Sequence, residues 1–513
     1  MGGMTKYITV RNVVKAAPLL GLAGLYLLIQ LVFNGVLSGF GIFRDEFYYL
    51  VNAERLDWGY VDHPPLAPLL LSGVRATLGE STLALRLLPA LAGAGTVLLA
   101  GLTARRMGGT LVAQVIAALA VIAVPVYGVM FGFYSMNALE ILLWAAAAYV
   151  AVVLLTEDQP WLWLLFGLLV GIGLQNKHTF LIFAVGLVLG LLLHRRNAFR
   201  NRWIWLGGLL ALVILLPNLI WQVQHHWPTL EFYAGVADKN IARSPLDVLL
   251  DQLLAMNPGL LAVWLLGLIW LLRSRTFRPL AWSYLLPLLL LMVLGSSRPD
   301  RLAPAYLPLF AAGVVNIEEL ARWQMRLRWL PAAALLLVLV GAGAVAPLGL
   351  PLLPPQTTAR YAEAFGLGSY EEGVTAELPQ YFADRFGWQE LTTTVAQVYS
   401  ELSPEEQEQV GIFTSNYGEA GAIHFYGRGY GLPEPISGHN NYWLWGPGNW
   451  SGEVLIAVNV PREELARFYA SVEQVASTSC RFCVDYENNA PILVARRPKV
   501  ALMEVWPQAK HYE

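Results

Sequence analysis

Charge is scarce in this chain, and that scarcity excludes the commonest class of protein. Of 513 residues, 14% are charged and 56% are hydrophobic, whereas about 25% of the residues of a soluble domain are charged. A soluble globular protein is therefore excluded, and a protein that crosses the membrane many times is expected. No basic patch suggests nucleic acid as a partner, and the formal net charge of −2 points to no other.

Cysteine is also nearly absent. The chain has two, Cys480 and Cys483, in a Cys-x-x-Cys arrangement. Two thiols are too few for a closed tetrahedral zinc site unless histidines join them. A local disulfide is one interpretation in an oxidising compartment, and the residues alone leave open whether it forms. A thioredoxin-like redox role is disfavoured, because the pattern typical of such a site is missing around the pair. The chain also lacks a clear internal repeat and low-complexity tracts.

The apolar residues are concentrated in blocks long enough to cross a bilayer as helices. The first block lacks an Ala-x-Ala exit and is too long for a signal-peptide core, so we expect an uncleaved signal anchor. We expect about eleven transmembrane helices, near residues 16–39, 84–104, 111–127, 138–155, 161–174, 180–193, 204–221, 249–272, 280–294, 302–315 and 330–350.

Basic residues indicate the direction of these spans. Lys6, Arg11 and Lys15 precede the first block, which predicts a cytoplasmic N-terminus in the cell (inner or plasma) membrane. Arginines then recur in the loops predicted to be cytoplasmic, at 105–106, 195–202, 273–278 and 322–328. A few basic residues run against this bias on the outer side and are candidates for function: Arg44, Lys177, Lys239, Arg298 and Arg301.

The composition changes after the proline-rich stretch at 347–355. We therefore divide the chain into a transmembrane domain, residues 1–350, and a soluble α/β domain outside the cytoplasm, residues 351–513. Within the second part, Ser403-Pro404 and Pro461 resemble helix starts. Residues 454–458 and 492–495 are predicted strands. An odd number of spans places this domain on the extracytoplasmic side.

Two adjacent carboxylates, Asp45 and Glu46, follow the first apolar block directly. Acidic groups beside a membrane-embedded helix end are costly to desolvate, which favours a functional role. His63-Pro64-Pro65-Leu66 follows before the next long block. A solvated loop with a helix cap and a Pro-Pro turn is the alternative interpretation, and the residues alone leave both open.

These residues resemble the first-loop signature of the GT-C glycosyltransferases, in particular the protein O-mannosyltransferase family and its relatives, including the lipid A aminoarabinose transferase. The resemblance rests on Asp45-Glu46-Phe47-Tyr48-Tyr49 and His63-Pro64-Pro65-Leu66. It extends over nearly the whole chain through residues 134–140, 173–178, 217–222, 384–388, 416–418 and 437–440. The resemblance implies the GT-C fold and transfer of a sugar from a polyprenyl-phosphate carrier to a protein, lipid or glycan acceptor on the outer side.

The resemblance also implies which carboxylates are catalytic. Asp45 is the expected base that takes the acceptor proton, and Glu46 either orients the acceptor or holds a helix end. Direct displacement from opposite the phosphate would invert the anomeric centre. Glu140 could supply a second carboxylate for a covalent route, or could match a helix dipole. Many relatives carry an aspartate near Asn137 and Glu140, so this chain departs from the pattern there.

Donor binding is assigned to polar residues of the outer loops. His63 occupies a position where the aminoarabinose branch carries lysine, and a turn histidine without a ligand is the alternative. Lys177 suits a lipid phosphate, unless it is a lysine that extends to the interface. The remaining substrate-binding candidates are Tyr48, Asn137, His178 and Arg301. We expect no obligatory cofactor, although Asp45 and Glu140 could hold a divalent metal together with water.

Two other classes of function compete with the transferase. A transporter or flippase for a lipid or sugar should show paired, interrupted helices in two corresponding halves and charges near mid-membrane. We find no such symmetry, and Asp45, Glu46 and Lys177 are predicted at one face. A non-catalytic envelope scaffold that acts through the tail leaves the acidic and basic loops unexplained.

Overall fold

The computed structural model describes residues 10–37 and 39–513. The chain folds into two compact units, and both are discontinuous in sequence. The helical unit comprises residues 1–38, 81–219 and 242–352, and the mixed unit comprises 39–80, 220–241 and 353–513. The division expected from sequence, at residues 350 and 351, stays a prediction about domains. Lys6, used to predict the orientation of the N-terminus, lies outside the described residues.

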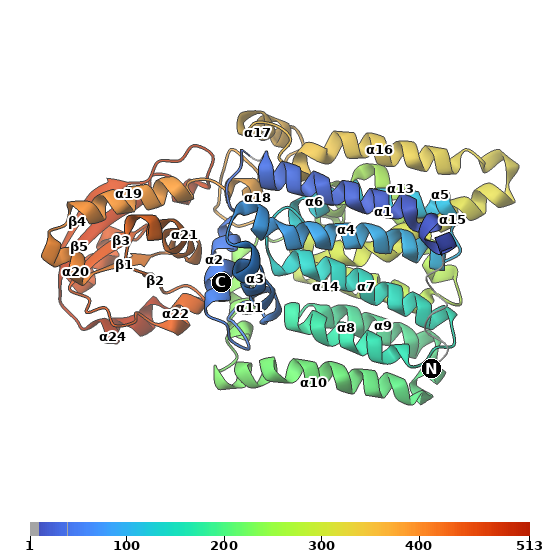
Figure 1. Ribbon diagram of the computed structural model, residues 1–513, viewed down its shortest axis with the longest axis horizontal. Helices are drawn as coiled ribbons and strands as arrows, with labels where there is room; N and C mark the ends of the chain where they lie inside the picture. The colour runs from blue at the N-terminus through green and yellow to red at the C-terminus, as the bar shows by residue number, and fades with distance from the viewer. Residues whose placement is uncertain (1–9, 38) are drawn as a thin grey trace. The chain divides into compact units, whose positions relative to one another are not determined.

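The helical unit is a bundle of long apolar helices that run roughly parallel to one another (Figure 1). Its helices are α1 (Val10–Gln30), α4 (Thr82–Arg106), α5 (Leu111–Ile122), α6 (Pro125–Met130), α7 (Met136–Thr156), α8 (Leu162–Asn176), α9 (Phe180–His194), α10 (Arg202–Gln224), α12 (Pro245–Ala255), α13 (Leu261–Arg273), α14 (Arg278–Leu294), α15 (Leu307–Trp323) and α16 (Leu330–Gly349). A 3₁₀ segment, η4 (Pro299–Tyr306), precedes α15.

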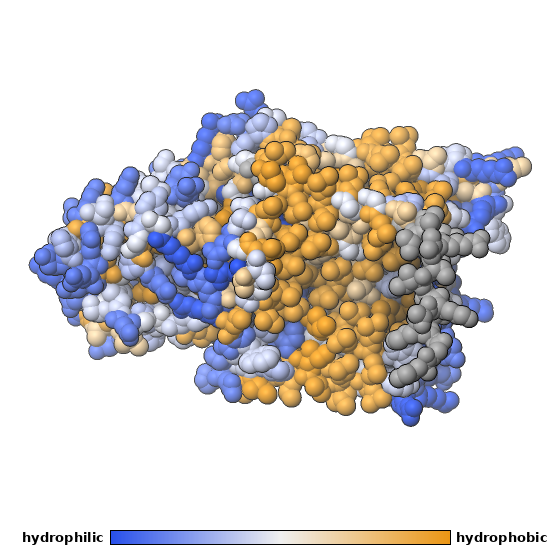
Figure 2. All heavy atoms as spheres, viewed as in Figure 1, coloured by the Kyte–Doolittle hydropathy of each residue, from blue (hydrophilic) through white to orange (hydrophobic). Residues whose placement is uncertain are grey.

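Apolar side chains cover the outside of this bundle. Figure 2 shows hydrophobic residues over the face of the helical unit seen in that view. Helix α10 is the clearest case, because Leu209, Leu212, Val213 and Leu216 are all more than 45% exposed. A row of exposed leucine and valine side chains on a long helix fits hydrocarbon rather than water. The chain is therefore a helical membrane protein.

The described residues contain five helices long and apolar enough to cross a membrane: Ala17–Val36, Thr82–Arg106, Met136–Thr156, Arg202–Gln224 and Met325–Gly349. Shorter apolar helices cover several other predicted spans, at Leu111–Ile122, Leu162–Asn176, Phe180–His194 and Arg278–Leu294. The expected total of about eleven thus stays a prediction.

One transmembrane span predicted as a single continuous helix is broken in the structure. We expected a single helix over 249–272, but α12 and α13 are bent by 99° at the break between them. Asn257 causes the break, because it precedes Pro258 and a residue before proline is disfavoured in the helical region. Asn257 instead takes a φ of 67°. Its side chain accepts from the Gly259 backbone N–H at 2.9 Å and donates to the Ala123 carbonyl.

Glycines allow neighbouring helices of the bundle to approach closely. A Cβ at Gly190 on α9 would collide with the Pro279 carbonyl on α14, and a Cβ at Gly313 on α15 with the Val263 carbonyl on α13. Small residues at such crossings are typical of membrane helix pairs, where close backbone packing replaces the hydrophobic driving force.

The mixed unit is built on a five-stranded sheet with the order β2-β1-β3-β5-β4. Strand β1 (Val410–Thr414) is parallel to both β2 (Pro435–Ser437) and β3 (Val454–Val458). Strand β5 (Pro491–Pro498) is antiparallel to β3 and to β4 (Tyr469–Ser477). Strands β3 and β5 correspond to the two strands predicted from sequence.

Helices cover both faces of this sheet. Leucines and valines of α19 (Trp388–Glu401) pack against Ile412, Ile456 and Val494 on one face. On the other face, Leu465 of α23 (Arg462–Phe468) packs with Leu455 and Leu493. The other helices of the tail are α17 (Pro355–Ala364), α18 (Gln380–Ala383), α20 (Pro404–Gln409), α21 (Tyr417–Gly427), α22 (Asn441–Trp445) and α24 (Leu502–Val505).

The mixed unit also contains three helices from earlier in the chain, α2 (Arg44–Glu54), α3 (Leu66–Leu78) and α11 (Pro228–Lys239). Helix α2 packs on α21, where Tyr48 and Val51 share a buried cluster with Ala420 and Tyr442. The segment that contains Asp45 and Glu46 therefore belongs to the same compact unit as the tail.

Cys480 and Cys483, for which a disulfide was left open, are free thiols in the structure. Each sulfur instead takes part in a local turn. The Cys483 backbone N–H donates to Cys480 Sγ at 3.2 Å, and the Cys483 thiol donates to the Cys480 carbonyl at 3.4 Å. These bonds hold the two side chains in a turn geometry without a covalent link.

A pair of buried carboxyl groups, Glu419 and Glu487, lies beside the N-terminus of α21. Burial raises the pKa of Glu419 to about 7. Burial also raises the pKa of Glu487, and the neighbouring Glu419 adds to the rise. Two carboxylates held close together disfavour each other's charge, which favours the state in which one of them holds a proton. Asn416 completes the group by donating to Glu487 Oε1 at 3.0 Å.

The raised pKa values predict a stability that falls as pH rises. The folded pair holds its proton more tightly than the unfolded chain does, so its contribution is present at low pH and lost as pH passes about 7. We expect the thermal unfolding midpoint of the purified protein to fall as pH rises from about 4.5, the ordinary pKa of a glutamate, to about 7. Glu487→Gln removes one titrating carboxyl from the pair and should flatten this fall, whereas the exposed control Glu408→Gln should not. An equal slope in all three proteins would contradict the raised pKa values of the pair.

Candidate functional site

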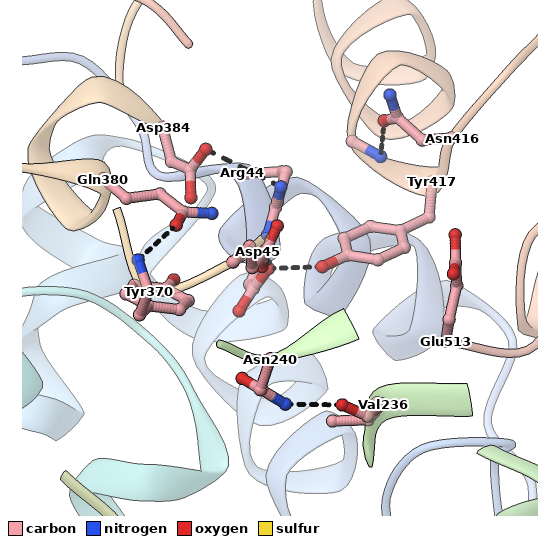
Figure 3. Close-up of polar contacts among 12 residues, drawn as sticks. Arg44, Asp45, Val236, Asn240, Tyr370, Gln380, Asp384, Asn416, Tyr417 and Glu513 are labelled. Carbon is pink, nitrogen blue, oxygen red and sulfur yellow. Dashed lines mark hydrogen bonds and ion pairs between the residues drawn. The ribbon is translucent and has the colours of Figure 1, made fainter. Parts of the chain in front are cut away.

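The predicted acidic pair lies at the N-terminus of α2, and its two members have different surroundings. Glu46 is fully buried, and its Oε2 accepts from the Phe43 backbone N–H at 2.8 Å in a capping box. This contact fits the second of the two roles expected for Glu46, holding a helix end. Asp45 keeps 32% of its side chain exposed and accepts from the Tyr417 hydroxyl at 2.8 Å (Figure 3).

Arg44 is shared by several carboxylates around Asp45. Its guanidinium lies 3.7 Å from Asp45, from Glu371 and from Asp384, and its Nη1 donates to the Tyr486 hydroxyl at 2.7 Å. Burial raises the pKa of Asp384 to about 7, although Arg44 opposes the shift. One cation among three acids leaves an anionic surrounding. Asp45 is the only one of these three acids with substantial exposure, so it is the carboxylate that a substrate can reach.

Tyr48 and His63 are both buried and engaged with their neighbours. The Tyr48 hydroxyl donates to Asp62 Oδ1 at 2.9 Å. His63 Nδ1 lies 2.9 Å from the Pro64 carbonyl and Nε2 lies 3.0 Å from Asn52 Nδ2. These partners assign the Nδ1–H tautomer, with Nε2 as the acceptor. Both ring nitrogens of His63 are thus occupied, which fits the alternative of a turn histidine, and we do not carry it forward as a phosphate ligand.

In the helical unit, four of the predicted residues gather around the α8–α9 turn. Lys177 Nζ donates to Asn137 Oδ1 at 2.7 Å and to Glu140 Oε2 at 2.9 Å. Thr179 donates to Glu140 Oε1 at 2.5 Å. His178 Nε2 lies 2.8 Å from Asn218 Oδ1 on α10. An ammonium has three N–H donors, so Lys177 uses two of its three within the part of the chain that the structure describes.

Two arginines belong to the same neighbourhood. Arg298 forms a two-pronged pair with Asp300, at 2.9 and 3.1 Å, and Arg301 donates to Ser296 Oγ at 3.1 Å. Burial alone would raise the pKa of Asp300, but Arg298, Lys177 and Arg301 together lower it to about 2. Among these five residues, three cations (Arg298, Arg301 and Lys177) lie near two carboxylates, Glu140 and Asp300, so positive charges outnumber negative ones. We name these five residues the cationic cluster.

The predicted residues thus fall into two groups, one in each unit. Asp45, Glu46, Tyr48 and His63 belong to the mixed unit. Asn137, Glu140, Lys177, His178 and Arg301 belong to the helical unit. Each group is assembled by its own contacts. Asp45 and Glu140, which could hold a divalent metal together with water, belong to different units.

Sequence reasoning missed Tyr417 as a partner of Asp45. The two residues are 372 positions apart, and the N-terminus of α21 brings them together. The available signal was the segment 416–418, which carries part of the family resemblance but no recognisable chemistry. Arg44 was singled out as a basic residue on the outer side, but its contacts with Glu371 and Asp384, more than 300 positions away, were not foreseeable.

Comparison with known proteins shows which families and folds this chain resembles. The family model for dolichyl-phosphate-mannose-protein mannosyltransferase matches residues 62–221, a stretch that includes Asn137, Glu140 and Lys177 but not Asp45. The chain is similar to the lipid A galacturonosyltransferase RgtD of Rhizobium johnstonii, with 26% identity over 297 residues. The match covers 56% of this chain and 61% of the relative, so the chain spans about three fifths of the curated relative.

The fold is also similar to crystal structures of ArnT from Cupriavidus metallidurans. The apo structure matches with a TM-score of 0.62 and 15% identity, covering 92% of this chain and 97% of ArnT. The structure bound to undecaprenyl phosphate matches with the same TM-score and 14% identity, covering 95% of this chain and 98% of ArnT. The chain is therefore a helical membrane protein with the GT-C fold.

Proposed function

We propose that this protein is a glycosyltransferase of the extracytoplasmic face of the bacterial inner membrane. It moves a sugar from a polyprenyl-phosphate carrier to an acceptor hydroxyl, with inversion. The observation that carries the proposal is Asp45, a partly exposed carboxylate held by one hydroxyl among buried acids. Similarity to RgtD and to ArnT, whose structure contains undecaprenyl phosphate, supports the donor and acceptor classes.

Asp45 is the base in this proposal. The acceptor oxygen attacks the anomeric carbon, the bond from that carbon to the phosphate oxygen breaks, and the bonding pair leaves with the phosphate. The proton of the acceptor hydroxyl passes to a carboxylate oxygen of Asp45. The Tyr417 hydroxyl already donates to Oδ1 at 2.8 Å. That bond fixes the carboxylate and leaves Oδ2 for the acceptor proton.

The cationic cluster binds the donor phosphate in this proposal. A phosphodiester carries one negative charge, and the departing phosphate gains a second as the bond breaks. The excess positive charge of the cluster balances the negative charge of the bound phosphodiester. The remaining Lys177 N–H can donate to the phosphate oxygen that gains the second negative charge. Asn137 and Glu140 hold Lys177 in place, so the ammonium does not need to reorganise during the reaction.

The acceptor is a lipid-linked or glycan hydroxyl, since lipid A is the acceptor in the name of the sequence relative. A protein hydroxyl remains the alternative from the mannosyltransferase model. The N-terminus lies in the cytoplasm and the mixed unit outside it, where Asp45 is available to extracytoplasmic acceptors. A transporter would place its charges near mid-membrane, but Glu140 lies in the first two turns of α7 and Lys177 follows the last residue of α8.

We predict that Asp45→Asn abolishes transfer but not donor binding. Purified protein would be given a panel of polyprenyl-phosphate sugars with cell-envelope extract as the acceptor, and sugar transfer would be measured. Removal of the base should lower turnover by at least about 10²-fold. The exposed Asp57→Asn should retain wild-type turnover and is the matched control.

The outcomes separate the two parts of the claim. If the wild type transfers a sugar and Asp45→Asn does so equally well, the protein is a transferase but Asp45 is not its base. If the wild type turns over no donor of the panel, the transferase proposal itself fails and the transporter gains weight.

A second prediction concerns Lys177. Removing its charge alone would strand the buried Glu140 carboxylate, so the test is the double variant Lys177→Met with Glu140→Gln. A hydrogen bond to a charged group contributes about 1.5–3 kcal/mol, so donor KM should rise roughly 10- to 100-fold. Glu140→Gln alone keeps the ammonium and should change KM much less. A double variant with the wild-type KM would exclude Lys177 as a phosphate ligand.

A further inference from the structure

Two histidines of the mixed unit meet where the last residues of the chain run beside the loop after β2. The two segments pair as extended backbone, with the His511 N–H donating to the Gly438 carbonyl at 3.0 Å and the Asn440 N–H to the His511 carbonyl at 3.1 Å. Their imidazole rings are 4.4 Å apart between centroids. This contact joins parts of the sequence that neither the transfer chemistry nor the core explains.

His439 has the hydrogen-bonding pattern of a metal ligand. It is 3% exposed, and its Nε2 donates to the main-chain oxygen of Glu513 at 2.9 Å. This bond leaves the lone pair on Nδ1, which has no hydrogen-bond partner among the described residues. Metal-binding histidines typically donate their other ring N–H to a carbonyl or carboxylate, and a buried nitrogen without a partner is costly unless something occupies it.

His511 supplies a second, independent observation. Its Nδ1 lies 3.0 Å from the Ala509 carbonyl oxygen and its Nε2 lies 3.1 Å from the Ser415 carbonyl oxygen. A neutral imidazole carries one N–H, so one of its nitrogens turns a lone pair toward a carbonyl oxygen. The repulsion between these two electron-rich atoms is relieved when a proton or a metal ion binds at that nitrogen.

Glu513 provides an anionic oxygen at the same place. One ligand atom from each of His439, His511 and Glu513 lies within 4.8 Å of the other two. Ligand atoms of a tetrahedral zinc site are about 3.4 Å apart, from metal–ligand bonds of about 2.0–2.1 Å. The ligand atoms must therefore come closer together to bind zinc. Rotation of the exposed Glu513 side chain can shorten its distances to the two imidazoles, which are already in contact.

We propose that His439, His511 and Glu513 form a binding site for a divalent transition metal of the zinc class. Two imidazoles and one carboxylate are ligands that zinc prefers, and the Ser415 carbonyl or water can fill a fourth position. The site is separate from the proposed transfer chemistry. It would fix the final residues beside Tyr417, whose ring lies 4.7 Å from that of His439 and whose hydroxyl holds Asp45.

Zinc binding by the full chain tests the site directly. The protein would be purified in detergent without a polyhistidine tag, stripped with a chelator, and titrated with Zn²⁺ against a competing indicator dye. All variants would carry Cys480→Ser and Cys483→Ser, so that thiols contribute no binding. We expect one Zn²⁺ per chain, and X-ray absorption at the zinc edge should show two imidazole nitrogens at about 2.0–2.1 Å.

The variants distinguish this site from adventitious binding. Loss of an outer partner of a metal ligand already costs 10- to 100-fold in affinity, so His439→Ala should weaken Zn²⁺ binding at least about 100-fold. Glu513→Gln changes an exposed side chain and serves if His439→Ala does not fold; it should weaken binding at least about 10-fold. The exposed His226→Asn should bind as the parent does. No binding by the parent, or equal affinity in every variant, would overturn the proposal.

Discussion

The packing of α2 on α21 is the interaction on which the candidate site depends. Phe47 of α2 lies very close to Gly421 of α21. A Cβ atom added at Gly421 would be 2.8 Å from the Cβ of Phe47, so only glycine fits there. This approach brings Asp45, in the first turn of the same helix, to the hydroxyl of Tyr417. The segment that follows the first apolar helix thereby becomes part of the same unit as the tail. A change at Gly421 would separate the carboxylate from its partner without touching either.

Each of the two units holds its own cluster of charged residues. The acids around Arg44 surround Asp45 with negative charge, which favours proton uptake by the base. The cationic cluster holds three positive groups against two negative ones, which favours a phosphate. Each group is held by direct hydrogen bonds within its own unit, so the charged atoms are positioned before a substrate arrives.

Features of the fold and the site that depend on residues near each other in sequence were predictable, whereas contacts between residues far apart in sequence were not. The scarcity of charge and the apolar blocks predicted a helical membrane protein, because helix–bilayer matching is local in sequence. The sequence predicted that Asn137 and Glu140 share one helical face, but not that both of them contact Lys177. The bend at Asn257 was missed although Pro258 signals it, because hydropathy does not distinguish one straight helix from two bent ones. The Tyr417 partner of Asp45, the two occupied nitrogens of His63 and the pairing of His439 with His511 depend on tertiary packing, which no spacing in the sequence encodes.

The central claim is a single displacement assisted by one carboxylate, and the configuration of the transferred sugar tests it most directly. The product of the purified enzyme with a donor of defined anomeric configuration would be analysed by NMR. Inversion relative to the donor is predicted, because the acceptor attacks opposite the departing phosphate. Retention would require two successive displacements through a second carboxylate and would contradict the account.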